Sequence, residues 1–162
     1  MTMEAYVLCD RAPDGFPDWQ RAIEALDFGL TLQPSRELVR HQGHLPATWR
    51  GREVGFEVDP FTFADLTETY DDVDFVRPWP CVYAFYFSSL SGCVGAWMAI
   101  AAWVRMNGGM AYDPQADRLL TAEEAVRYAR AGIDSFDETM AELNAAMAGS
   151  TGSTGSTGRA DT

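Results

Sequence analysis

The feature that most constrains the fold is a pair of apolar segments in the middle of the chain. Residues 82–87 are continuously apolar and aromatic, which predicts a central strand covered on both faces. Residues 93–104 are apolar on nearly every side of a helix that Ser89 or Ser91 caps and residues 107–109 end. This run is about half of the ~20 residues that cross a membrane, so it predicts a buried helix. We expect Trp97, on this helix, to lie in the hydrophobic core of the protein.

Shorter signals on either side supply further strands and helices. Apolar runs and alternating patterns indicate strands, while helical spacing, an early proline and the Thr121/Glu124 capping box indicate helices. Strands are predicted at residues 5–9, 30–32, 54–58 and 110–112, and helices at residues 17–28 and 122–147, with a break near Gly132 left open. The order predicts an α+β fold in which a mostly antiparallel sheet packs against two to three helices as a single pair of layers.

The end of the chain differs from the rest in composition. From Ser150 the triplet Ser-Thr-Gly occurs three times, which is typical of a flexible segment. We therefore expect residues 1–148 to form one domain and residues 149–162 to be a disordered tail that the fold does not need. A domain of this length buries enough surface to fold without disulfides or a structural metal.

The charge of the chain restricts its partners. The formal net charge is −12, which repels nucleic acid and anionic membranes but attracts a basic protein. The same charge is also explained by solubility alone. The first residues lack a basic stretch, so no signal peptide is expected, and we predict a cytoplasmic location. The three cysteines, Cys9, Cys81 and Cys93, are expected to be reduced and buried.

Candidate catalytic and metal-binding residues are few. His41 and His44 are three residues apart, but Gly43 and Pro46 argue against the helix on which such a pair binds zinc. Cys93 lies near the start of a predicted helix, where a thiol is activated, yet no histidine base can be placed beside it. A small core residue is the simpler interpretation. We therefore predict no catalytic residue, no metal and no cofactor.

Residues 53–74 contain eight acidic residues and no basic residue. Aromatic residues are interleaved with them (Phe61, Phe63, Tyr70, Phe75 and Trp79). Two interpretations remain open: a recognition surface for a basic partner, or core aromatics beside solvated acids. The segment lacks the spacing and the central glycine of a calcium-binding loop. The predicted partner-binding residues are Asp65, Glu68, Tyr70, Asp71, Asp72, Asp74 and Phe75.

A basic cluster precedes this segment. Arg36, Arg40, Arg50 and Arg52 fall within seventeen residues of one another in an otherwise acidic chain. They are candidates for phosphate binding or for pairing with the acidic segment. No glycine-rich phosphate loop accompanies them, so we favour internal pairing.

Two segments of the chain carry a resemblance to a known family. The first runs from Leu45-Pro46-Ala47-Thr48-Trp49 through residue 57, and the second covers residues 107–115 and 119–125. Both resemble small bacterial immunity proteins of polymorphic-toxin systems. Such proteins bind a secreted toxin domain and block it. The resemblance implies a cognate toxin as the partner, and it carries over no binding residue.

The resemblance and the charge together predict a non-enzymatic immunity or antitoxin-like protein that occludes the active site of a basic toxin. Two alternatives stay open. One is a small hydrolase with a carboxylate-bound metal, which could reverse a toxin's modification. The other is a housekeeping protein that binds a small molecule.

Overall fold

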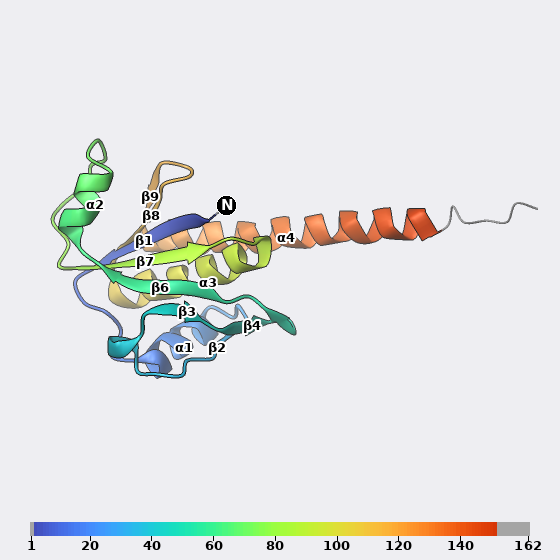
Figure 1. Ribbon diagram of the computed structural model, residues 1–162, viewed down its shortest axis with the longest axis horizontal. Coiled ribbons are helices and arrows are strands. Elements are labelled where there is room, and N and C mark those ends of the chain that lie inside the picture. Colours follow the sequence, from blue (N-terminus) through green and yellow to red (C-terminus); the bar gives the residue numbers. More distant parts are fainter. Residues whose placement is uncertain (1, 152–162) are drawn as a thin grey trace, which may run out of the picture.

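A six-stranded antiparallel sheet is the centre of the computed structural model, which describes residues 2–151 (Figure 1). The strand order is β3-β6-β7-β1-β8-β9. The strands are β1 (Met3–Cys9), β3 (Gly43–Leu45), β6 (Phe56–Phe61), β7 (Cys81–Phe87), β8 (Met110–Asp113) and β9 (Arg118–Leu120). This architecture confirms the α+β fold class. The predicted tail falls mainly on residues 152–162, which lie outside the described residues.

The two middle strands, β1 and β7, pair along their whole length, from Met3 opposite Phe87 to Cys9 opposite Cys81. Alternate residues of a strand point to opposite faces of the sheet. Ala5, Val7 and Cys9 therefore face the main core, whereas Tyr6 and Leu8 face a second apolar cluster. Burial of residues on both faces confirms the central position predicted for residues 82–87.

A smaller antiparallel sheet, of order β2-β4-β5, contributes buried residues of β2 and β4 to the main core. Its strands are β2 (Leu30–Leu32), β4 (Ala47–Trp49) and β5 (Arg52–Glu53), and a short 3-10 helix, η1 (Leu38–Arg40), joins the region to β3. Helix α1 (Phe16–Ala25) packs against it, and the amide of Gln20 bonds to the backbone of Leu30 and Leu32. The sequence predicted β2 but left residues 35–50 without regular structure.

Helix α3 (Leu90–Asn107) packs on one face of the large sheet, and its buried residues form much of the main core. Ser89 caps it by accepting a hydrogen bond from Gly92 N, and Gly108 ends it in a left-handed conformation. Trp97 is 4% exposed, as predicted for the buried face. Within residues 2–151 no helix is long and apolar enough to span a membrane.

Helix α4 (Ala122–Thr151) begins at the predicted capping box, where Thr121 and Glu124 each bond to the other's backbone N–H. It runs without a break through Gly132 and includes Ser150 and Thr151, so it is longer than predicted. Its first half packs on α3, and its second half extends well beyond the sheet (Figure 1). Leu143 on the extension is 52% exposed.

The structure also contains a helix within the acidic segment, where the sequence predicted none. Helix α2 (Phe63–Thr69) is capped by Thr62, whose side chain accepts from Asp65 N at 3.1 Å. Leu66 from this helix joins Phe75 and Trp79 in the second apolar cluster, on the face of the sheet opposite α3. The sheet is therefore covered by helices on both faces rather than on one.

Candidate functional site

The acidic residues of α2 and the loop after it lie on its outer surface. Every carboxylate in the predicted partner-binding set is exposed to solvent: Asp65, Glu68, Asp71, Asp72 and Asp74. Their positions follow from local structure, because Leu66 is the residue that α2 buries and the acids occupy its other sides. The Asp74 carboxylate also accepts from Val76 N at 2.9 Å, which holds the loop after the helix.

The aromatic members of the predicted set are placed differently. Phe75 is only 4% exposed, with its ring 5.2 Å from that of Tyr112, so it is a core residue and not an exposed contact. Tyr70 is half-buried against Tyr6 and Tyr112. Aromatics between acids therefore fill the second cluster, and the prediction that Phe75 anchors a partner is wrong. Of the two aromatics, Tyr70 alone keeps a surface that a partner can reach.

Three further carboxylates, those of Glu4, Glu57 and Asp59, lie on the same face of the large sheet as α2. They occupy the part of this face that α2 leaves uncovered. The strand register sets His44, Glu57, Tyr86 and Glu4 side by side across β3, β6, β7 and β1. Burial raises the pKa of Tyr86, and the nearby charges of Glu4, Asp59 and Glu57 raise it further. Glu57 and Asp59 belong to the acidic segment recognised in the sequence, but no sequence signal pointed to Glu4, which comes from a strand far from them in the chain.

Tyr70 connects the two groups of acids. Its hydroxyl donates a short hydrogen bond to the Glu4 carboxylate. Burial, together with this bond to Glu4, raises the pKa of Tyr70 to about 12, so the phenol stays protonated and remains the donor. The bond fixes the end of α2 on β1. We call the combined surface the acidic face and define it as Glu4, Glu57, Asp59, Asp65, Glu68, Asp71, Asp72 and Asp74.

A hollow of about 230 Å³ indents the acidic face where β3, β6 and β7 meet. His44, Glu57, Tyr86 and Ser89 contribute to its walls. Such a recess suits a side chain of a partner better than a drug-sized ligand, whose pockets enclose about 300–1,000 Å³.

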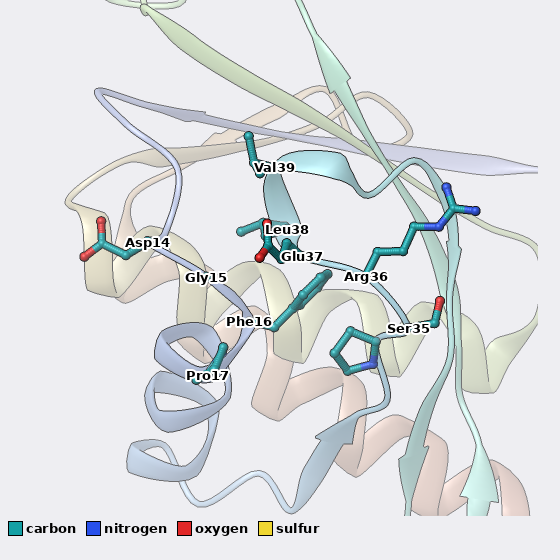
Figure 2. Close-up of a pocket in the computed structure, with 10 residues that line it drawn as sticks. Asp14, Gly15, Phe16, Pro17, Ser35, Arg36, Glu37, Leu38 and Val39 are labelled. Carbon is teal, nitrogen blue, oxygen red and sulfur yellow. The ribbon is translucent and has the colours of Figure 1, made fainter.

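A larger hollow of about 680 Å³ lies between the start of α1 and the loop after β2. Figure 2 shows Phe16 between these segments, with the carboxylate of Asp14 and the guanidinium of Arg36 pointing to opposite sides. Val39, which also lines it, is 81% exposed. Charged groups that diverge do not act on one ligand atom, so this arrangement shows no catalytic geometry.

The two histidines do not converge. His41 is buried against Phe16, with Nε2 2.9 Å from the Gly43 carbonyl oxygen, whereas His44 is exposed beside Gly55. Across the described part of the chain, no three His, Cys, Asp or Glu side chains gather as metal ligands. The carboxylates of the acidic face are thus spread over a surface.

Two residues of the arginine cluster, Arg50 and Arg52, contact α4 rather than the acidic segment, contrary to our expectation. Arg50 Nη1 lies 2.6 Å from Asp137 Oδ1, and its guanidinium stacks 4.2 Å from the Trp49 ring. Arg52 lies over the ring of Phe136. These contacts join the small sheet to α4 and leave the acidic face without a basic counterpart from this cluster.

The Cys93 thiol is not activated. Burial, with a smaller contribution from the Asp113 charge, raises its pKa from 9.0 to about 11. A raised pKa keeps the thiol protonated, so below pH 11 little nucleophilic thiolate is present in the folded protein.

We therefore expect iodoacetamide to alkylate Cys93 slowly at pH 8, with a rate that rises up to about pH 11. Peptide mapping by mass spectrometry would follow this residue alone. The urea-unfolded protein is the control, because there Cys93 should titrate near its ordinary value. Rapid alkylation of folded protein at pH 7 would show that the thiol is activated after all.

Comparison with protein-family models, curated proteins and solved structures found no match. The resemblance to immunity proteins therefore stays a prediction.

Proposed function

We propose that this protein is an immunity or antitoxin-like binding protein that neutralises a basic toxin by covering its active site with the acidic face. The observation that supports this most is the separation of charge. Residues 53–76 include eight acids and no base, and the five acids of α2 and its loop are all exposed. Like charges held together on a folded surface repel one another, so a basic partner would relieve an unfavourable arrangement.

The shape of the surface also supports binding. The second apolar cluster holds α2 against the sheet, and the Tyr70–Glu4 hydrogen bond fixes its end. The acids are therefore displayed on a rigid support, which reduces the ordering entropy that binding would otherwise lose. Tyr70 and Tyr86 supply partly exposed aromatic surface among the carboxylates, of the kind that contributes most at interfaces. No observation favours the hydrolase or the housekeeping alternative over this proposal.

The test compares binding before and after the charge is removed. Immobilised protein would capture its partner from the native host, and the partner would then be purified for kinetic measurements. The variant replaces five acids by their amides: Asp65→Asn, Glu68→Gln, Asp71→Asn, Asp72→Asn and Asp74→Asn. Association should slow by at least about tenfold at low salt, and the difference should shrink as salt rises, because screening shortens the reach of the charges.

A matched control removes the same amount of charge elsewhere on the exposed surface: Asp27→Asn, Glu37→Gln, Asp134→Asn, Glu138→Gln and Glu142→Gln. Both variants should unfold within about 1 kcal/mol of the original protein, because exposed charges contribute little to stability. If both slow association equally, net charge alone steers the encounter. If the acidic-face variant associates as fast as the original at low salt, the acidic face is not the binding surface.

A further inference from the structure

We propose that Cys9 and Cys81 form a thiol–disulfide pair, a modification site that low-molecular-weight disulfides would oxidise to a cross-strand disulfide between β1 and β7. The inference goes beyond the proposed function and does not depend on it. The three cysteines are free in the structure, and the proposal adds an oxidised state to the reduced one expected from the sequence. Cys93, the remaining thiol, lies on α3 and provides an internal comparison.

The strand register carries the inference. Cys9 and Cys81 are direct partners at the end of the antiparallel β1–β7 ladder. Directly opposite residues point to the same face, with Cα atoms about 4.5–5.5 Å apart. A disulfide requires Cα atoms about 4.4–6.8 Å apart, so the backbone is already placed for the bond. The two residues are 72 positions apart in sequence, which is why spacing gave no signal.

The surroundings of the two sulfur atoms suit exchange chemistry. Cys9 is fully buried, and the indole N–H of Trp103 points to its Sγ at 3.4 Å. The Cys81 thiol donates toward Cys9, which lowers the pKa of Cys9 and, together with burial, raises that of Cys81. The first proton therefore leaves from Cys9, where two donors stabilise the thiolate. Cys81 is partly exposed whereas Cys9 is buried, so a reagent is expected to reach Cys81 first.

The reaction balances as two successive exchanges. The Cys81 thiol attacks one sulfur of a small disulfide as its proton passes to the adjacent Cys9 thiolate. A bond forms between the Cys81 sulfur and that sulfur, and the other half leaves as a thiolate with the bonding pair and takes the proton from Cys9. Cys9 thiolate then attacks the Cys81 sulfur and expels the second half. The protein loses two electrons and two protons, and the small disulfide is reduced to two thiols.

The experiment treats folded protein with oxidised glutathione and measures intact mass and linked peptides. Unmodified protein and the Cys93→Ser variant should both lose two hydrogens and yield one linked pair, Cys9 with Cys81. Cys9→Ser should instead stop with one glutathione on Cys81, because the second exchange has no attacking thiolate. Cys81→Ser should react far more slowly at Cys9 than the unmodified protein reacts at Cys81.

Circular dichroism before and after treatment checks that each protein is folded. If Cys9→Ser does not fold, the unmodified protein and Cys93→Ser still decide the matter. A Cys9–Cys81 link in both supports the proposal. The proposal is overturned if the folded protein forms no disulfide, if the disulfide involves Cys93, or if the disulfide appears only after unfolding in urea.

Discussion

Replacing Trp97 by alanine is expected to lower the free energy of unfolding by about 3–5 kcal/mol, as truncation of a buried tryptophan does elsewhere. Trp97 is 4% exposed, and its ring lies 4.6 Å from that of Tyr128 on α4. Tyr128 in turn donates to the Asp113 carboxylate at the end of β8, at 2.7 Å. The substitution therefore opens a cavity where α3, α4 and β8 meet. Urea unfolding followed by circular dichroism would measure the change.

Leu143→Ala is the control for this prediction. Leu143 lies on the extension of α4 and is half-exposed, so its truncation should change stability by about 0.5 kcal/mol or less. Equal effects of the two substitutions would show that α3 and α4 do not pack through Trp97 as the structure has it.

Gly95→Ala should also destabilise the protein strongly, by about 1–3 kcal/mol or more, since an added methyl group in a packed region forces neighbours apart. A Cβ at Gly95 on α3 would collide with the Val54 carbonyl oxygen and press on its side chain. Val54 cannot easily move, because its N–H donates to the Ala47 carbonyl oxygen at 2.9 Å. Thermal unfolding and the urea midpoint would both report the loss.

Gly132→Ala provides the matched substitution in another helix. A Cβ at Gly132 on α4 meets nothing within 4 Å, so alanine gains helix propensity without a clash. Stability should rise by about 0.5–1 kcal/mol. If Gly95→Ala also raises the stability of the protein, α3 does not approach Val54 as closely as the structure has it.

The sequence predicted best those elements whose signals are local. A cap at Ser89 or Ser91, a helix end at residues 107–109 and the Thr121/Glu124 box were predicted from neighbouring residues. The structure has the cap at Ser89, the end at Gly108 and the capping box as predicted. Helix α2 and β9 were missed. Helix α2 has a single fully buried position, Leu66, so it has too few turns to show a periodic pattern. Strand β9 has three residues and is defined by its pairing with β8.

The candidate site was predicted only in part, for a physical reason. Exposure of acids such as Asp71 and Asp72 follows from charge, but burial of Phe75 depends on the sheet face that α2 covers. Glu4, Glu57 and Asp59 join the site through strand register, which composition does not encode. The cysteine pair was missed for the same reason. Contacts between strands that are distant in sequence are known only from the three-dimensional structure.

The position of β1 has a consequence for the order of folding. The first strand of the chain lies inside the sheet, and its two neighbours are β7 and β8, which end at Phe87 and Asp113. The nearer partner in sequence, β7, is complete only after 78 residues beyond Cys9 have been synthesised. Until then the apolar residues of β1 stay unpaired, and long-range pairing of this kind is slow and exposed to aggregation. Correct folding therefore requires that the apolar residues of β1 avoid self-association until β7 and β8 have been synthesised.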